Sequence, residues 1–232
     1  MSKRGRSSVR KSLTEASEDY LKAIYTLEQK EDRVSTKLVA ERLGVQPASA
    51  TAMLKKLATA RLLKHEPYRG VQLTDAGRKV ALEMIRHHRL IETYLSEALG
   101  VPWDKVHDEA ERWEHVLSEE MEDRIDAFLG HPTHDPHGAP IPTRAGEIPP
   151  RAKVSLSEVP IGGIVQVAEV SDDDPELLRY LTSLELALGT QLEVVGSEPF
   201  EGPLTLRVGE RNLPIGRAVA KRIRVRSITE DK

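Results

Sequence analysis

Two short helical segments separated by a glycine turn constrain this chain more than any other feature of its sequence. In the stretch STKLVAERLGVQPASATAMLKKLATARLL, Ser35 or Thr36 can cap a first helix that ends near Gly44, because a short side-chain oxygen satisfies the free N–H groups of a first helical turn. Pro47 then falls in the first turn of a second helix, where a missing N–H is tolerated. This spacing predicts a helix-turn-helix.

The segments on either side extend this motif. After the second helix, LLKHEPYRGVQLT is typical of strand, turn and strand, with Pro67 and Gly70 in the turn. Before the first helix, residues 15–27 place apolar side chains at helical spacing, which predicts an amphipathic helix with one buried face. A helix pair followed by a hairpin predicts a winged helix-turn-helix.

The middle and the end of the chain carry two further patterns. A long helix is predicted over residues 75–99 and another from Trp103 to Gly130, joined by a short Gly-Val-Pro connection that makes them antiparallel. The proline-rich stretch that follows, up to Lys153, has no helical periodicity and predicts a linker. Beyond it, short alternating strands and one short helix predict a small antiparallel β-barrel.

Charge is distributed unevenly along the chain. Residues 1–79 carry 17 lysines and arginines against 9 acidic residues, a net charge of +8, whereas residues 80–150 have a net charge of −9. A basic first third indicates a module that faces nucleic acid, although a solvated charged surface without a partner is the alternative. No apolar run is long enough for a membrane span, and the basic start lacks an apolar segment behind it, so we expect a cytoplasmic protein.

The stretch HDEAERWEHV concentrates potential metal ligands. On a continuous helix His107, Glu111, Glu114 and His115 fall within a sector of about 100°. The chain has no cysteine, so such a site must use imidazole and oxygen ligands. The alternative is an acidic solvent face. On the preceding helix, RHHRLIETY offers a second set of ligands one turn apart, and the antiparallel connection lets this set face His107. The two residues of this set are His88 and Glu92.

Four segments together carry a family resemblance. The segments SEDYLKAIY, RHHRLIETYL, KVHDEAERWEHVLSEEME and PHGAPIP resemble the motifs of the diphtheria toxin repressor family of metal-dependent transcription regulators, in its long form with a C-terminal SH3-like domain. The resemblance implies two metal sites. One is implied to contain His88, Glu92 and His107, aided by the C-terminal domain, and the other, which controls activation, is implied to contain Asp19, Glu111, Glu114 and His115.

The departures from the iron-responsive members bear on the choice of metal. Where those members use methionine and cysteine, this chain has Asp19 and Glu111, and hard oxygen donors favour Mn²⁺. We therefore expect a Mn²⁺-responsive regulator, with an Fe²⁺-responsive regulator of the same family as the alternative. The manganese-responsive branch resembles the chain at both positions but often carries glutamate in place of Lys22.

Two other groups of residues are weaker metal candidates. The segment SDDDPELL aligns loosely with a family loop that reaches back to the metal, and its candidates are Asp172, Asp173, Asp174 and Glu176. The alternative is an acidic N-cap and first turn of the helix that follows. His131, His134 and His137 have chelating spacing, but a proline-rich linker does not fix their geometry, so we do not expect them to bind metal.

The second helix of the helix-turn-helix should enter the major groove of DNA. Its first residues should lie near base edges, and nearby polar and basic residues should contact phosphates. The residues predicted near base edges are Gln46, Pro47, Ala48, Ser49 and Thr51, and the predicted phosphate contacts include Thr36, Lys55, Lys56, Lys64, Tyr68 and Arg69. For Lys55 and Lys56 a solvated helix face is the alternative.

These expectations combine into one interpretation of the whole chain. Residues 1–75 should form the domain that binds double-stranded DNA, and residues 76–140 should form the domain that binds metal and dimerises. Residues 141–152 should be a linker to residues 153–232, which should form the SH3-like, FeoA-like β domain. The homodimer should read a pseudo-palindromic operator and control metal-uptake and homeostasis genes. The expected dimer contacts are Leu117, Ile125, Phe128 and Leu129. We expect no enzyme, although a carboxylate-bridged metalloenzyme and a metal-independent winged-helix regulator are alternatives.

Overall fold

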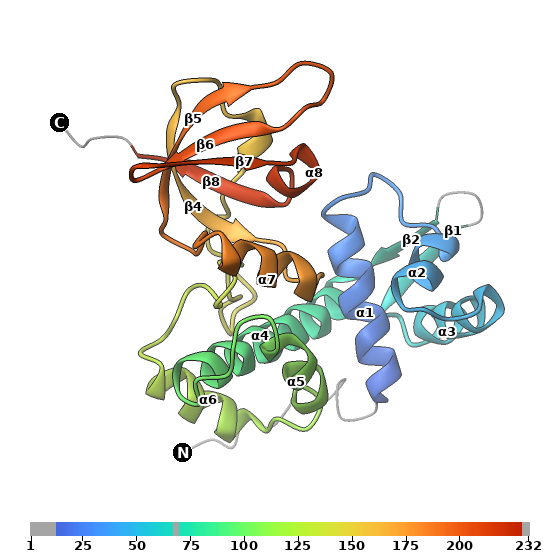
Figure 1. Ribbon diagram of the computed structural model, residues 1–232. Coiled ribbons are helices and arrows are strands. Elements are labelled where there is room, and N and C mark those ends of the chain that lie inside the picture. Colours follow the sequence, from blue (N-terminus) through green and yellow to red (C-terminus); the bar gives the residue numbers. More distant parts are fainter. Residues whose placement is uncertain (1–12, 67–69, 229–232) are drawn as a thin grey trace. The chain divides into compact units, whose positions relative to one another are not determined.

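Figure 1 shows the computed structural model of the chain, which describes residues 13–66 and 70–228. The chain divides into two compact units. The first unit consists of Met1–Ile91, Glu111–His131 and Pro142–Ile148, and the second of Glu92–Ala110, Pro132–Ile141 and Pro149–Lys232. Among the described residues, no helix combines the length and the apolar character that crossing a bilayer requires.

The first unit begins with the predicted winged helix-turn-helix. Its elements are α1 (Glu15–Glu28), α2 (Thr36–Arg42), α3 (Pro47–Thr59), β1 (Leu63–Glu66) and β2 (Gly70–Leu73). Ser35 caps α2, since its Oγ accepts a hydrogen bond from the Leu38 N–H at 3.2 Å, and Pro47 begins α3. The two strands pair antiparallel, with Leu63 opposite Leu73. The helix-turn-helix and the hairpin expected from the sequence are thereby confirmed.

One hydrophobic core joins these elements. Leu21 and Ile24 of α1, Leu54 and Leu57 of α3, and Val71 of β2 are almost fully buried in it. Each such side chain contributes about 1.5–3 kcal/mol of transfer free energy. Because α1 contributes to the same core as α2, α3 and the two strands, it belongs mechanically to this group of elements.

Two helices replace the single helix that we expected between Trp103 and Gly130. They are α5 (Val106–Trp113) and α6 (Glu119–Phe128), and both follow the long α4 (Asp75–Glu97). Ser118 accepts a hydrogen bond through Oγ from the Met121 N–H at 3.2 Å, and acidic residues fill the first turn of α6. This cap and the favourable interaction of acids with the helix dipole start a new helix and leave a turn after Trp113.

The break changes which apolar residues are exposed. Leu117 and Ile125, which we expected at a dimer contact, are buried within the first unit, so they offer little surface to a second chain. Phe128 is 69% exposed, and three further large apolar side chains from this region of the unit are also exposed. These three are Trp113, Val116 and Met121.

The second unit contains a six-stranded antiparallel sheet with the order β3-β8-β4-β5-β6-β7, in which the end strands β3 and β7 do not pair in the described part of the chain, so the barrel that we expected is not closed. Its strands are β3 (Val154–Ser155), β4 (Ile164–Val170), β5 (Gln191–Ser197), β6 (Leu204–Val208), β7 (Arg211–Ile215) and β8 (Ile223–Ser227), and its short helices are η2 (Leu156–Glu158), α7 (Pro175–Ser183) and α8 (Arg217–Ala220). Strands β4, β5, β6 and β8 correspond to the short alternating strands expected from the sequence, and α7 corresponds to the one short helix. Strand β7 was not expected, because Asn212 and Pro214 interrupt its apolar alternation.

The proline-rich segment before the sheet is more ordered than a linker requires. Asp135, His137 and Ala139 are buried, and the Val170 N–H donates to the His137 carbonyl at 2.8 Å. Gly138 lies against β4 with φ +87°, and an added Cβ would lie 2.1 Å from the Ala168 carbonyl oxygen. The loop therefore has a fixed geometry, contrary to our expectation for its histidines.

Candidate metal centres

The first candidate centre, which we call the Asp19 cluster, consists of Asp19, Glu114 and His115. One ligand atom of each residue lies within 4.8 Å of the others, and all three belong to the first unit. His115 Nε2 lies 2.9 Å from Asp19 Oδ1 and 3.7 Å from Glu114 Oε1. Asp19 is on α1, whereas the other two follow α5, so the cluster joins two parts of the chain that are far apart in sequence.

The end of α5 at Trp113 determines how these side chains lie. Glu114 and His115 occupy the turn, not the continuous helical face from which we first expected them to bind. His87 Nδ1 lies 3.1 Å from the Glu114 carbonyl oxygen, to which it donates a hydrogen bond, and Glu114 is fully buried. The backbone around this buried carboxylate is therefore held independently of any metal.

Two acidic residues of α1 surround the His115 imidazole. Its Nδ1 lies 2.8 Å from Glu18 Oε2, and its Nε2 contacts Asp19. Burial alone would lower the pKa of His115, but the hydrogen bonds to Asp19 and Glu18 outweigh it and raise the pKa to about 10. The metal-free cluster therefore holds a proton at His115, as expected where carboxylates converge without a cation.

A lysine lies beside the Asp19 cluster. The Lys22 Nζ is 2.6 Å from Glu111 Oε1, 2.8 Å from both oxygens of Glu114 and 3.3 Å from His88 Nδ1. Burial opposes the charge of Lys22, but the carboxylates of Glu114 and Glu111 outweigh it and raise its pKa. Burial likewise opposes the charge of Glu114, and the His88 and Lys22 contacts outweigh it and lower the pKa of Glu114. The ammonium group therefore neutralises part of the acidic site.

Glu111 lies differently from our expectation. We expected it in one set with Asp19, Glu114 and His115, whereas the structure groups it with His88 and Glu114. Glu114 belongs to both groups, and His88 Nδ1 makes a short contact with its Oε2. The first unit thus contains two overlapping sets of ligands, one of which is next to Lys22.

The second unit contains another group of potential ligands, formed by Glu92, His137 and Asp172. His137 Nδ1 lies 3.9 Å from Glu92 Oε2. His107 Nδ1 lies 3.3 Å from Glu92 Oε1 and 4.0 Å from Asp172 Oδ2. We call these four residues the Glu92 cluster. His88 lies one turn before Glu92 on α4, as we expected, so the two side chains project from the same face of that helix.

His137 has the contacts of an imidazole prepared to bind a cation. Its Nε2 donates to the Trp103 carbonyl at 2.8 Å, and its ring stacks on Trp103 with centroids 5.9 Å apart. A carbonyl only accepts, so Nε2 carries a proton, and the tautomer with its proton at Nε2 has at Nδ1 the lone pair that a metal needs. This buried atom has no hydrogen-bond partner in the described part of the chain. A lone pair that faces a carboxylate fits a bound cation, and the partner carbonyl is typical of ligating histidines.

The remaining metal candidates have other contacts. Asp174 caps α7, accepting hydrogen bonds from the N–H groups of Glu176 and Leu177 at 3.0 and 3.3 Å, and pairs with Arg222 at 2.8 Å. Asp174 and Glu176 therefore form the N-cap and the first turn of α7, which was the alternative to metal binding. His131 contacts Asp126 on the exposed surface, and His134 is exposed.

The predicted DNA contacts lie on or beside α3. The side chains of Gln46, Pro47, Ala48, Ser49, Lys55 and Lys56 are exposed, and those of Thr36 and Thr51 are partly exposed. Thr51 Oγ1 donates a hydrogen bond to the Pro47 carbonyl at 2.8 Å, so its hydroxyl proton is already used within the helix. Tyr68 and Arg69 lie outside the described residues. The exposed start of α3 is available to a partner.

Comparisons with known proteins decide the family. Residues 12–71 match the model of the iron dependent repressor N-terminal DNA binding domain, residues 74–143 match its metal binding and dimerisation domain, and residues 154–227 match the FeoA domain. The chain is also 32% identical over 228 residues to the iron-dependent repressor IdeR of Mycobacterium leprae, covering 93% of this chain and 99% of that protein. The chain belongs to the iron-dependent repressor family. It is therefore a metal-dependent transcription regulator by family.

Solved structures of this family include manganese-dependent members. A manganese-dependent transcriptional repressor in complex with manganese has a TM-score of 0.85 and 41% identity, covering 91% of this chain and all of that one. The manganese regulator SloR has a TM-score of 0.76 and 33% identity, covering 91% of this chain and 98% of that one. The family name, iron dependent repressor, therefore does not specify the metal that each member uses.

Sequence reasoning missed two participants in the clusters of this repressor. Glu18 is 5% exposed and contacts His115, and the only signal for it is its position next to Asp19 in SEDY. His137 was set aside because it lies in a proline-rich stretch. The adjacent glycine was the available signal, since Gly138 permits the positive φ that packs this loop against β4.

Proposed function

We propose that this chain is a Mn²⁺-dependent regulator that binds operator DNA as a homodimer when loaded with metal. The observation that carries the proposal is the contact of His115 with Asp19 at 2.9 Å. It brings a ligand of α1, a helix in the core of the DNA-binding part, to two ligands of the turn after α5. A metal held there would link α1, which shares a hydrophobic core with the DNA-recognition helix α3, to the turn after α5.

The chemistry of the donors supports manganese. The Asp19 cluster and Glu111 offer carboxylate oxygens and imidazole nitrogens, and the sequence contains no cysteine. Carboxylate and imidazole donors suit Mn²⁺, whereas soft sulfur ligands would select softer ions. Fe²⁺ is the second candidate, since the same donors accept it and the relative IdeR is named as iron-dependent.

Linkage is the mechanism that we propose. In the metal-free protein, protonated His115 and Lys22 neutralise the carboxylates of Asp19 and Glu114. When bound, Mn²⁺ would supply this positive charge instead. Asp19 then holds α1 against the turn after α5, which restricts the DNA-binding part to fewer arrangements. If the arrangement that binds DNA is the one retained, DNA must tighten metal binding by the same factor, about 5–150-fold for typical couplings.

The Glu92 cluster is proposed as a further metal site. Glu92, His107, His137 and Asp172 supply two carboxylates and two imidazoles, and the lone pair of His137 Nδ1 faces Glu92. Its ligands belong to α4, α5, the loop before Gly138 and the loop after β4. We propose that the β domain, which contains β3 to β8, is SH3-like, as expected from the sequence. One of its roles would be to present Asp172, in the loop after β4, to this site.

DNA recognition is proposed to rest on the exposed start of α3. Gln46, Ala48 and Ser49 would lie near base edges, and Lys55 and Lys56 would contact phosphates. We propose that two chains dimerise through exposed apolar side chains that include Val116, Met121 and Phe128, so that paired recognition helices read a pseudo-palindrome in cytoplasmic DNA.

The decisive experiment measures DNA binding by the full chain after chelation and after addition of Mn²⁺ or Fe²⁺. We expect tighter binding with Mn²⁺, and equal affinity in the chelated and Mn²⁺-loaded protein would overturn the proposal. Asp19→Met and Glu111→Cys should loosen selectivity toward Fe²⁺, Co²⁺ or Zn²⁺. Asp108→Cys is the matched control, because Asp108 is an exposed acid on the same helix as Glu111.

A further inference from the structure

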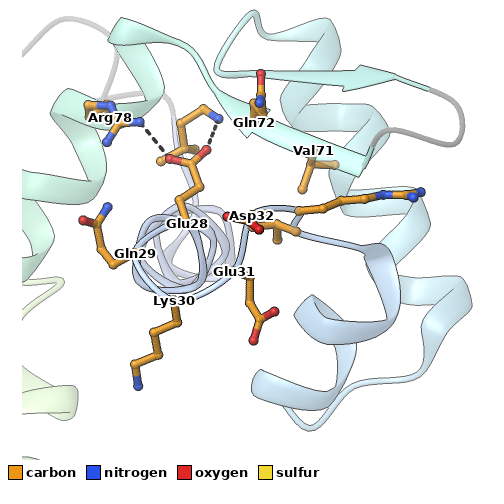
Figure 2. Close-up of a pocket in the computed structure, with 11 residues that line it drawn as sticks. Glu28, Gln29, Lys30, Glu31, Asp32, Val71, Gln72 and Arg78 are labelled. Carbon is orange, nitrogen blue, oxygen red and sulfur yellow. Dashed lines mark hydrogen bonds and ion pairs between the residues drawn. The ribbon is translucent and has the colours of Figure 1, made fainter.

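A second connection of α1 lies at its other end. Glu28, the last residue of α1, is only 13% exposed in its side chain. Its Oε1 accepts a hydrogen bond from the Leu73 N–H at 2.7 Å, and its Oε2 accepts one from Arg78 Nη2 at 2.8 Å. Leu73 ends β2 and Arg78 lies in α4, so one carboxylate holds three elements together (Figure 2).

Two contacts with α1 fix the orientation of the Arg78 side chain. Its guanidinium lies 5.4 Å from the centre of the Tyr25 ring, one turn before Glu28 on α1. A cation over an aromatic face and a carboxylate on its edge together fix the plane of a guanidinium. Arg78 is therefore held by α1 at two points, and the Glu28 carboxylate is oriented so that its other oxygen faces the backbone of β2.

The wing, which we define as β1 and β2, is held from a second side as well. The Val71 N–H donates to the Val34 carbonyl at 2.9 Å, and an added Cβ on Gly70 would lie 2.3 Å from the same oxygen. The segment between α1 and Val34 lines a pocket of about 490 Å³ together with β2 and Arg78 (Figure 2). Among the contacts drawn in Figure 2, the one between the Glu28 carboxylate and the Leu73 N–H joins a side chain of α1 to the β2 backbone.

Helix α1 joins this contact to the Asp19 cluster. Asp19 and Glu28 are nine residues apart on one continuous helix, which is about 13 Å along its axis. The side chains between them that face the core, Leu21 and Ile24, are fully buried. A helix packed in this way moves as a rigid element, so a restraint on Asp19 at one end restrains Glu28 at the other.

We propose that Glu28 is a positioning residue that ties the wing to α1, so that metal capture at the Asp19 cluster sets where the wing lies against DNA. This inference rests on the proposed function, because it names the contact through which metal would control one DNA-binding element. Glu28 contacts neither metal nor DNA in this role. It acts through the Leu73 backbone and through Arg78.

The test compares Glu28→Ala, Glu28→Gln and the matched control Glu31→Gln in the full chain. Glu31 is an exposed acid that lines the same pocket, so its variant makes the same charge change as Glu28→Gln. DNA affinity is measured with and without Mn²⁺, and Mn²⁺ affinity is measured separately without DNA. We expect Glu28→Ala to reduce the ratio of the two DNA affinities about tenfold, and Glu31→Gln to leave it within about twofold.

Glu28→Gln is the conservative variant. Its amide keeps an oxygen that can accept from the Leu73 N–H but loses the ion pair with Arg78, so it should recover most of the ratio that the alanine variant loses. A merely structural role would weaken DNA binding equally with and without Mn²⁺ and would leave the ratio intact. Such an equal loss, or a ratio in Glu28→Ala equal to that of the unaltered chain, overturns the inference.

Hydrogen exchange at the Leu73 amide provides a readout without DNA. Mn²⁺ should slow this exchange in the unaltered protein and in Glu31→Gln, and it should have a much smaller effect in Glu28→Ala. If Mn²⁺ leaves the exchange rate of the Leu73 amide unchanged while DNA binding by the same protein still depends on Mn²⁺, the role of Glu28 is overturned but the proposed function is not. DNA binding by the unaltered chain that does not respond to Mn²⁺ overturns the proposed function instead.

Discussion

The ammonium group of Lys22 lies 2.8 Å from both carboxylate oxygens of Glu114, which is fully buried. An internal cation thus occupies one side of an acidic site. The same nitrogen contacts Glu111 and His88, which form a potential ligand set with Glu114. Lys22 therefore competes with any ion that would use this second set.

Lys22→Met should allow the first unit to bind an additional Mn²⁺. Methionine keeps most of the side-chain length and removes the charge, so Glu111, Glu114 and His88 lose the cation that neutralises them. The number of bound ions, counted by titration calorimetry and by electron paramagnetic resonance of free Mn²⁺, should rise by one. Lys30→Met, at an exposed lysine of the same part of the chain, should leave the count unchanged. An unchanged count in Lys22→Met would show that the ammonium does not limit the site.

Metal binding at the Asp19 cluster should release a proton. His115 has a pKa of about 10 in the metal-free protein, and a metal requires its neutral form. Its raised pKa stabilises the metal-free fold fully below about pH 6.5, and this contribution is lost as the pH rises through about 10. Between these values Mn²⁺ affinity should increase with pH, up to about tenfold per unit.

Calorimetry of Mn²⁺ binding in buffers of different ionisation enthalpy measures this proton directly. We expect close to one proton per ion from His115 at neutral pH, and fewer as the pH approaches 10. His131→Gln serves as the control, because that exposed histidine pairs with Asp126 away from the cluster. Binding without proton release at neutral pH would contradict the contacts that we describe for His115.

Acid should destabilise the first unit through Glu122. Burial alone would raise the pKa of Glu122, but the contacts of His87 and Arg86 outweigh it and lower the pKa from 4.5 to about 2. The resulting stabilisation is present above pH 4.5 and is lost as the pH falls through about 2, and it amounts to about 3 kcal/mol. Glu122→Gln should therefore lower the free energy of unfolding at neutral pH, and its difference from the unaltered chain should shrink in acid.

Urea unfolding at several pH values tests this expectation. Glu120→Gln is the matched control, since Glu120 lies in the same helix but pairs with Arg124 on the exposed surface. It should change the unfolding free energy little at any pH. A difference between the Glu122→Gln variant and the unaltered chain that stays constant from neutral pH to pH 2 would disagree with the lowered pKa.

His137→Phe should remove one bound Mn²⁺ and leave the Asp19 cluster intact. Phenylalanine retains a planar ring that can stack on Trp103 but offers no nitrogen to a cation. Bound ions can be counted after gel filtration, and Mn²⁺ affinity at the remaining site can be measured by titration. His134→Phe, at an exposed histidine of the same loop, should keep the full count. If His137→Phe also keeps it, the Glu92 cluster does not depend on this imidazole.

The features that the sequence could predict are those determined by neighbouring residues. Ser35 and Pro47 place the two helices of the helix-turn-helix, because caps and first-turn prolines act within a few residues. The same locality explains why the strands from β4 to β6 were foreseen from their alternation. Asp19, Glu114 and His115 were foreseen as metal ligands only through the family resemblance, because nothing local connects α1 to α5.

The features that escaped prediction depend on tertiary contacts or on competing local signals. The Ser118 cap competes with a helical periodicity that runs through it, and in the structure the cap ends the longer helix. The pairing of Lys22 with Glu111 brings together residues 89 positions apart. His137 lies in a stretch whose composition indicates a linker, and its burial follows from packing against β4 and Trp103.

The close approach of Gly138 to Ala168 has a consequence for how this protein can vary. Any side chain at position 138 would push the loop away from β4 and carry the His137 imidazole with it, although residue 138 itself has no donor atom. Spontaneous mutants that no longer respond to their metal should therefore arise at this glycine as well as at the ligands themselves, and a genetic screen for such mutants would recover it.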